Sequence, residues 1–436
     1  MKKGLFIVAI LFTGCNGGVV DRLLKKSSPY EKYLETLEST SLRDFALVRD
    51  WKAVGEQVLR DSLQVMLPHQ EVAFFDPQVP KAMLLRYPVL EGQEVMAQLT
   101  PVTQKDAHFF MDIFEVDAAE QRLKRIHFAD SSGTISYQVH NSGIHALRIQ
   151  PELFRGGVFT LSIGYQGLLS FPLVGKGTVD IASFWGDPRD GDARKHEGVD
   201  IFSRRGTPVV AASSGSVRRV GNNRLGGKVV WLHDRDLGIS QYYAHLDSQL
   251  VQPGEHVNAG DTIGLVGNTG NAITTAPHLH FGIYRSGRGA VDPFPFLQDL
   301  HLPDDPDLAD SVDIGSLGTV TASSANVRHG PSTSSDMIAN YERNTLLQIE
   351  GKSGNWYRIT LPDGQKGFIY ETLAEKRDSP LREIEMTPLD EVWELREEST
   401  PVTGEIVSGK ALILGEFEGN YYVETASGFR GWWKVR

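Results

Sequence analysis

Cysteine is almost absent from this sequence, because Cys15 is the one cysteine among its 436 residues. A single thiol cannot form a disulfide within the chain, and it cannot build a cysteine-rich zinc cluster. Any metal ion must therefore be held by histidine, aspartate or glutamate side chains.

Basic residues are also scarce relative to acidic ones. The chain has 44 Lys and Arg residues against 55 Asp and Glu residues, which gives a net charge of −11. Surfaces that bind nucleic acids are rich in basic side chains, so we expect no nucleic-acid partner. The length of the chain predicts two to four domains.

The first 15 residues contain a short apolar run over 5–12, after Lys2 and Lys3 and before Thr13-Gly14-Cys15. This pattern is typical of a secretory signal and is too short for a membrane-spanning helix. Its end resembles a bacterial lipobox, in which the cysteine is lipidated, although Phe12 stands where that pattern prefers leucine. We therefore expect an exported envelope lipoprotein, anchored in a membrane through Cys15 on the periplasmic or surface side. The alternative is a plain signal peptide with an incidental cysteine.

Residues 16–79 are predicted to form a helical N-terminal segment. Ser28, Pro29 and Glu31 have the spacing of a capping box with proline at the first helical position. A second amphipathic run ends by Pro68 and carries apolar residues at helical spacing, namely Leu47, Trp51, Val54 and Val58. We interpret the two as a helical pair that packs on the next domain.

Residues 80–168 are predicted to form an antiparallel β-sandwich. Short runs of β-branched and aromatic residues recur there between turn signals, at Glu94–Leu99, Phe109–Val116, Thr134–Val139 and Val158–Tyr165. The histidines of this region lack the spacing of metal ligands. We interpret it as a structural or positioning module.

The C-terminal part begins with a Pro- and Asp-rich linker over 301–314 and contains an internal repeat. The stretch Gly354–Ile359 (GNWYRI) recurs as Gly419–Glu424 (GNYYVE). Residues 315–378 resemble bacterial SH3-like domains, and residues 379–436 resemble a divergent second copy. The resemblance implies small β-barrels, which in secreted enzymes often bind cell-wall peptides.

Residues 169–300 carry three short segments with informative histidine and aspartate residues. They are Lys195–Ile201 (KHEGVDI), Tyr242–Leu246 (YYAHL) and Pro277–Phe281 (PHLHF). In a strand, His278 and His280 would face the same spot, about 6–7 Å apart along the chain. In a straight strand, His196 and Asp200 would be about 13 Å apart. If both bind one metal ion, the chain must bend near Gly198.

Two histidines and one aspartate would leave a fourth tetrahedral position for water, which is the pattern of a catalytic zinc site. Zinc lowers the pKa of such a water towards about 7 and polarises a bound carbonyl group. Two further histidines would remain to move a proton to the leaving amine. No cysteine nucleophile is available, and no serine near these histidines lies in a nucleophile-elbow pattern.

The order of these motifs, HxxxD, a YxHL-like segment and HLHF, resembles the lysostaphin-type (LytM-like) zinc peptidases that cut peptidoglycan cross-bridges. The resemblance spans about residues 180–297. It includes glycine-rich segments at 206–215 and 254–267. It implies a compact, mostly antiparallel β domain with its site in a groove on one sheet.

The resemblance also implies the roles of five residues. His196, Asp200 and His280 would bind one zinc ion, and His245 and His278 would be the catalytic histidines. The predicted activity is zinc-dependent hydrolysis of peptide cross-links in peptidoglycan, with zinc-bound water as nucleophile.

Two alternatives accompany this prediction. The chain could be a non-catalytic envelope protein that binds peptidoglycan or activates another wall hydrolase, or it could use zinc only for structure.

A segment before the first ligand, 184–190, could cover the groove. Lys195, Arg204 and Arg205 could contact substrate carboxylates, although a solvated face is favoured for them. The sequence leaves open whether a D-alanyl–diaminopimelate bond or a glycine bridge is cut, and it predicts no oligomeric state.

Overall fold

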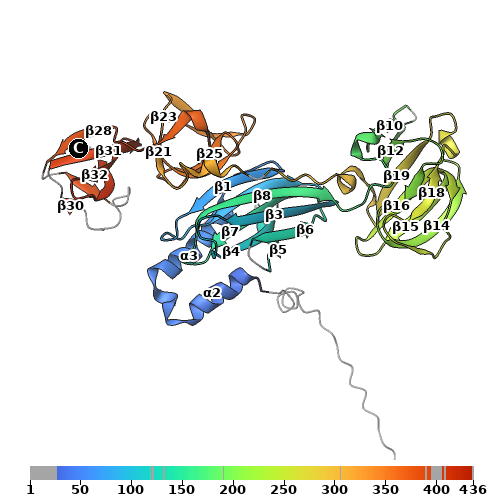
Figure 1. The fold of residues 1–436 in the computed structure, drawn as a ribbon, viewed down its shortest axis with the longest axis horizontal. Coiled ribbons are helices and arrows are strands. Elements are labelled where there is room, and N and C mark those ends of the chain that lie inside the picture. The colour runs from blue at the N-terminus through green and yellow to red at the C-terminus, as the bar shows by residue number, and fades with distance from the viewer. Residues whose placement is uncertain are drawn as a thin grey trace, which may run out of the picture.

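The structure is a computed structural model that describes residues 27–436, except 118, 120–121, 131–132, 190, 305, 388–389, 394–404, 407–408 and 435–436. The predicted signal segment and Cys15 lie outside the described residues. The chain is mainly β, as predicted, and Figure 1 shows its β domains side by side in a row. Within the described part of the chain, no helix has the length and apolar character needed to cross a membrane.

Two α-helices precede the first strand, α2 (Pro29–Ser39) and α3 (Ala46–Gln57), with the short 3-10 helices η1 (Ser41–Asp44) and η2 (Val58–Arg60). The predicted capping box is present. The Ser28 hydroxyl accepts a hydrogen bond from the Glu31 backbone N–H at 3.2 Å, and the Glu31 carboxylate accepts one from the Ser28 backbone N–H at 2.9 Å. The helices pack on the following domain, as expected, because Trp51 is buried there and its indole N–H donates to the Pro151 carbonyl at 2.8 Å.

The middle of the molecule is a β-sandwich. Its strands are β1 (His69–Phe75), β2 (Met83–Val89), β3 (Gln93–Pro101), β4 (Phe109–Val116), β5 (Leu123–Phe128), β6 (Thr134–Gln138), β7 (Gly143–Pro151) and β8 (Gly157–Gly167). One antiparallel sheet has the order β2-β7-β4-β5, and the facing strands run β1-β8-β3-β6. Buried side chains of both sheets fill the space between them, among them Leu85, Val95, Ile113 and Phe159. The four predicted strand segments correspond to β3, β4, β6 and β8.

The first strand of the sandwich lies before the predicted boundary at residue 80, because residues 69–75 form β1. β1 pairs with β8 along its whole length, and its Val72 and Ala73 also pair with Lys352 and Gly351 of β24. Five of the seven residues of β1 are buried, and Val72–Phe75 is a short apolar run without alternation. That run cannot be told from a buried helix by periodicity alone.

The next domain, over 169–300, is built on a ten-stranded antiparallel sheet with the central order β17-β14-β15-β16-β19-β12-β9. Its strands are β9 (Ile181–Ser183), β12 (Val199–Phe202), β13 (Pro208–Val210), β14 (Gly215–Asn223), β15 (Gly227–Asp234), β16 (Ile239–Gln249), β17 (His256–Val257), β18 (Thr262–Val266), β19 (His278–Arg285) and β20 (Gly289–Val291). A separate hairpin, β10 (Pro188–Arg189) with β11 (Arg194–Lys195), stands beside it, and the short helices are η3 (Thr178–Asp180), η4 (Gly270–Ala272) and η5 (Phe294–Leu297).

Two small β units complete the described chain. The first contains β21 (Leu317–Val320), β22 (Ser324–Arg328), β23 (Met337–Glu342), β24 (Leu346–Ser353), β25 (Trp356–Thr360), β26 (Lys366–Tyr370), η7 (Glu371–Leu373) and β27 (Ala374–Lys376). The second contains β28 (Arg382–Met386), β29 (Glu391–Trp393), β30 (Glu405–Ile406), β31 (Gly409–Phe417), β32 (Asn420–Thr425) and β33 (Arg430–Lys434).

The sequence repeat corresponds to one supersecondary unit. β24-β25-β26 and β31-β32-β33 are equivalent three-stranded meanders, and Gly354 and Gly419 both turn the first hairpin with a left-handed φ. The first unit is joined to the sandwich through the β1–β24 pairing. The predicted linker is ordered at its start, because the His301 backbone exchanges two hydrogen bonds with Tyr165 of β8, and it contains η6 (Leu308–Ser311).

Candidate functional site

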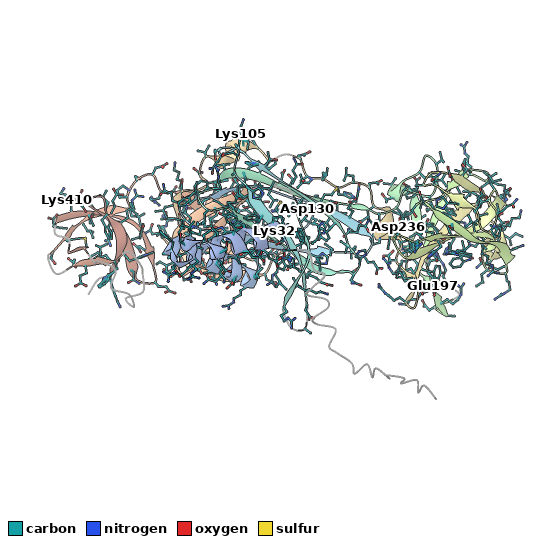
Figure 2. The ribbon with its side chains drawn as sticks, turned by 90° about the horizontal axis from the view of Figure 1, so that it is seen from below. Lys32, Lys105, Asp130, Glu197, Asp236 and Lys410 are labelled. Atoms are coloured by element: carbon teal, nitrogen blue, oxygen red, sulfur yellow. The ribbon has the colours of Figure 1, made fainter. Side chains whose placement is uncertain are left out.

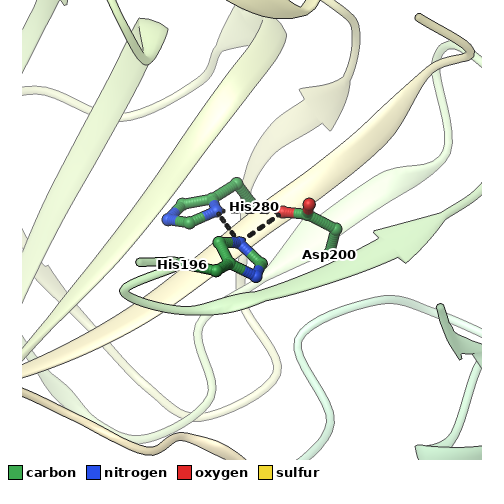
Figure 3. A group of neighbouring side chains, drawn as sticks. All are labelled: His196, Asp200 and His280. Carbon is green, nitrogen blue, oxygen red and sulfur yellow. Dashed lines mark hydrogen bonds and ion pairs between the residues drawn. The ribbon is translucent and has the colours of Figure 1, made fainter. Parts of the chain in front are cut away.

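Strand pairing brings the predicted ligands together at the middle of the sheet. β19 lies between β12 and β16, and His280 is paired in register with Asp200 on one side and with Ala244 on the other. Three atoms, His196 Nε2, Asp200 Oδ1 and His280 Nδ1, lie 2.9 to 3.1 Å from one another. Figure 3 shows the three side chains converging. In the described part of the chain, they form a group that could hold a metal ion.

The segment between His196 and Asp200 does bring these ligands together, as the metal hypothesis requires. β12 begins only at Val199, so His196 lies outside the regular strand. The expected bend at Gly198 needs no left-handed backbone there. Glycine is required because β19 approaches closely: an added Cβ would lie 2.5 Å from the Phe281 carbonyl oxygen and 2.7 Å from His280 Cε1.

The chemistry of these three atoms fits a bound cation. His196 Nδ1 lies 2.9 Å from the Phe184 carbonyl oxygen, which can only accept, so the neutral ring carries its proton on Nδ1. Its Nε2 therefore presents a lone pair to the Asp200 carboxylate oxygen 3.1 Å away. Two acceptors facing each other in a buried site repel unless a positive charge lies between them. Nitrogen and oxygen donors of this kind are those that zinc prefers when cysteine is absent.

Asp200 is held in its ionised form. The second carboxylate oxygen, Oδ2, accepts a hydrogen bond from the Arg189 guanidinium at 2.8 Å. Arg189 also donates to the Ser183 hydroxyl at 2.6 Å, so Asp200 is fixed on the side away from the two histidines.

His245 and His278 lie beside the metal group with their ring centroids 4.9 Å apart. His245 Nδ1 donates to the Thr269 carbonyl and His278 Nδ1 donates to the Ala276 carbonyl, each at 2.9 Å. Both neutral rings therefore keep Nε2 as a free acceptor. Burial, followed by the charges of the neighbouring histidines, lowers the pKa of His245 to about 4, so this ring is neutral at physiological pH.

The backbone at His245 is strained, with a φ of 62°. Strand alternation would place Tyr243, whose ring is buried in the core, and His245 on the same face of β16. The left-handed conformation turns His245 to the other face, where it lines the cavity with Tyr242 and Ala244. Strained residues of this kind cluster at functional sites.

All five predicted site residues line one cavity of about 620 Å³, which lies on the sheet. Lys195 also lines it, whereas Arg204 and Arg205 do not, and Arg205 instead pairs with Asp247 at 2.6 Å. Of the segment 184–190, Arg189 reaches the cavity, while the Phe184 carbonyl supports His196; Asp190 lies outside the described residues.

Several lining residues were not predicted from the sequence as site residues. They are Arg189, Glu197, Trp231, Tyr242 and Tyr284. Glu197 and Tyr242 belong to the motif segments themselves, so their position in the sequence could have identified them as site residues. Trp231 lies on β15, in a stretch with no motif, so only the sheet order places it in the cavity.

Comparisons with known proteins agree with this geometry. Residues 194–293, which include all five site residues, match Peptidase family M23, and residues 323–373 match the bacterial SH3 domain. The chain is 37% identical over 140 residues to an L-Ala–D-Glu endopeptidase of Bacillus subtilis, covering 30% of this chain and 43% of that protein.

Two further relatives match over a similar region. Lysostaphin of Staphylococcus simulans is 44% identical over 107 residues, which is 24% of this chain and 21% of lysostaphin. A lipoprotein of Escherichia coli named YgeR is 39% identical over 104 residues, which is 23% of this chain and 39% of YgeR. The chain thus spans less than half the length of each of these relatives. It carries a domain of peptidase family M23 at residues 194–293, followed by a bacterial SH3 domain at residues 323–373.

Proposed function

We propose that the chain is a zinc-dependent endopeptidase that hydrolyses peptide cross-links of peptidoglycan. One observation carries the proposal: three potential ligand atoms meet at one point of the cavity, and beside that point two histidines direct Nδ1 to backbone carbonyls and leave Nε2 without a hydrogen-bond partner among the described residues. An arrangement that only stabilised the fold would not need the second pair. An L-Ala–D-Glu endopeptidase and two proteins of Vibrio cholerae named as peptidoglycan DD-endopeptidases are among the relatives, and their names support the choice of substrate.

His196 Nε2, Asp200 Oδ1 and His280 Nδ1 would hold the ion. When bound, zinc polarises a peptide carbonyl and lowers the pKa of a water molecule towards about 7. His245 and His278 are oriented to accept a proton from the nucleophile through Nε2 and, once protonated there, to donate it to the leaving amine. The carbonyls of Thr269 and Ala276 keep both rings oriented for this transfer.

Cross-linked muropeptides provide the direct test. The purified chain, stripped with a chelator and reloaded with zinc, should separate the cross-linked peptides, with products identified by mass spectrometry. The stripped chain should leave them intact. A matched control is His233→Ala, because His233 bonds Ser240 in the same domain and does not line the cavity. If zinc-loaded wild-type chain and His280→Ala both leave the cross-links intact, the non-catalytic alternative is favoured.

We also propose that Cys15 is lipidated and holds the enzyme on a membrane of the cell envelope, and that the SH3 domain positions it on peptidoglycan peptides. The YgeR relative, named as a lipoprotein, supports the first proposal. Labelling cells with a radioactive fatty acid should mark the wild-type chain and not Cys15→Ser. Equal labelling of both chains would contradict lipidation at this residue.

A further inference from the structure

Three aromatic side chains line the cavity next to the metal group, and the proposed reaction uses none of them. Trp231, Tyr242 and Tyr284 come from β15, β16 and β19. The ring centroid of Trp231 lies 4.5 Å from that of Tyr242 and 5.0 Å from that of Tyr284. The Tyr242 ring lies 5.9 Å from the His280 ring, so the cluster begins at the metal group.

The register of the strands makes these rings one continuous wall. Trp231 is paired with Tyr242, and Tyr242 is paired with Gly282 on its other side. Gly282 has no side chain, and an added Cβ would lie 3.2 Å from Tyr284 Cε2. The Tyr284 ring therefore lies across the space above Gly282. It fills the gap that a glycine would otherwise leave in the wall.

A carboxylate stands at the edge of this wall. Glu197 is exposed, and its carboxylate accepts a hydrogen bond from the Tyr284 hydroxyl at 3.4 Å. Burial, and next the charge of Glu197, raises the pKa of Tyr284 to about 12, so the hydroxyl stays protonated as a donor. Among the described residues, no basic side chain forms an ion pair with Glu197, although Lys195 is only two residues away. The carboxylate is therefore available to a ligand.

Aromatic faces and a carboxylate together recognise one kind of group. Ring faces attract cations that come within about 6 Å, and they also pack against methylene stems. We propose that Trp231, Tyr242, Tyr284 and Glu197 form a specificity subsite for a substrate residue with an aliphatic stem and a free ammonium group, as in a diamino acid. The inference rests on the proposed function, because it concerns the peptide that the M23 domain would cleave. A bridge made only of glycine has no side chain for this subsite to hold.

Basic residues also line the cavity. Arg194 and Lys195 come from the β10–β11 hairpin and would attract substrate carboxylates. Arg219 lies on β14 and is paired with Trp231 of β15. Two strands lie between β14 and β19, so the axes of β14 and β19 are about 14 Å apart. The ammonium group is therefore expected beside Glu197, at the opposite end of the aromatic wall from Arg219.

The test measures binding and cleavage separately. The probes are a cross-linked peptide dimer with free side-chain amines, the same dimer after N-acetylation, and a pentaglycine peptide. Binding is measured by calorimetry on zinc-loaded His278→Ala chain, and cleavage on the zinc-loaded chain with His278 intact. We expect the free-amine dimer to bind about 10-fold more tightly than the acetylated dimer and to be cleaved with a kcat/KM about 10-fold higher. We expect pentaglycine to bind no better than the acetylated dimer.

Glu197→Gln should reduce both ratios to within about 2-fold. The matched control is Asp236→Asn, which removes one exposed carboxylate of the same domain outside the cavity and should keep both ratios (Figure 2). Equal binding of the two dimers, or a ratio that survives in Glu197→Gln, overturns the subsite. Binding that discriminates without any cleavage upholds the subsite and contradicts the proposed function. Cleavage of both dimers at equal rates supports the proposed function and contradicts the subsite.

Discussion

Two histidines that share one strand face present different nitrogens to the cavity. His278 uses Nδ1 to donate to the Ala276 carbonyl and keeps Nε2 free, whereas His280 Nδ1 lies 2.9 Å from the Asp200 carboxylate. Strand alternation places both side chains on the same face, but it does not distinguish their roles. The local hydrogen bonds make that distinction.

Replacing His278 or His280 by alanine should therefore have different effects. His280→Ala removes a ligand, so we expect loss of bound zinc and of cleavage together. His278→Ala leaves the three ligands in place, so we expect zinc to be retained while the cleavage rate falls by about 10²–10⁴-fold. Metal content by plasma mass spectrometry and cleavage of muropeptides check both results. Loss of zinc from His278→Ala would show that this residue is a ligand after all.

At the scale of the element, the site depends on how closely β12 and β19 approach. Asp200 and His280 face each other in register, and Gly198 allows the contact just before β12 begins. β16 contributes through an irregularity, the left-handed residue His245. The site thus combines one regular strand pair with one strained position.

Gly198→Ala tests the strand pair. The new methyl group would meet the Phe281 carbonyl and the His280 ring at 2.5 to 2.7 Å, so β12 and β19 must separate. We expect a loss of about 1–3 kcal/mol in the free energy of unfolding and weaker zinc binding. Thermal unfolding and zinc titration measure these effects. Gly143→Ala is the control, because an added Cβ there meets no atom within 4 Å. Unchanged zinc affinity in Gly198→Ala would argue against a close contact in solution.

At the scale of the molecule, the sandwich and the first C-terminal unit share one sheet and a buried group of charges. Arg358 of β25 donates to Glu71 of β1 at 2.6 Å and to Glu350 of β24 at 3.0 Å. Lys81 donates to Glu350 at 2.7 Å. Removing one member would leave buried charges with fewer partners, so this group couples the two domains.

The charges predict a specific dependence of stability on pH. Burial opposes ionisation of Glu350, but Lys81 and Arg358 outweigh it and lower the pKa of Glu350 from 4.5 to about 2. A depressed pKa stabilises the folded chain above the unfolded value, and this contribution is lost as the pH falls from about 4.5 to 2. We expect Glu350→Gln to cost roughly 3 kcal/mol at pH 7, with the difference from wild type closing over that interval.

Denaturant unfolding followed by tryptophan fluorescence at pH 7, 4 and 2.5 measures this difference. Glu375→Gln provides the control, because the Glu375 carboxylate is exposed and its ion pair with Arg377 should contribute at most about 1 kcal/mol. A difference between wild type and Glu350→Gln that stays constant from pH 7 to 2.5 would contradict the assigned pKa.

Features that depend only on neighbouring residues could be predicted from the amino-acid sequence. The capping box at Ser28 and Glu31, the repeated hairpins at Gly354 and Gly419, and the order of the three histidine motifs follow from local spacing. The need for histidine and aspartate as metal ligands followed from the near absence of cysteine. These features were predicted because a cap, a hairpin turn or a motif is complete within a few residues.

Contacts between side chains on different strands could not be predicted and became visible only in the folded chain. The orientation of His245, the contact of Arg189 with Asp200, and the aromatic wall of Trp231, Tyr242 and Tyr284 depend on which strands are neighbours and in which register. The same holds for the pairing of β1 with β24, which the sequence did not predict. The physical reason is that a period of two residues defines the faces of a strand, whereas its partners are chosen by packing between distant parts of the chain.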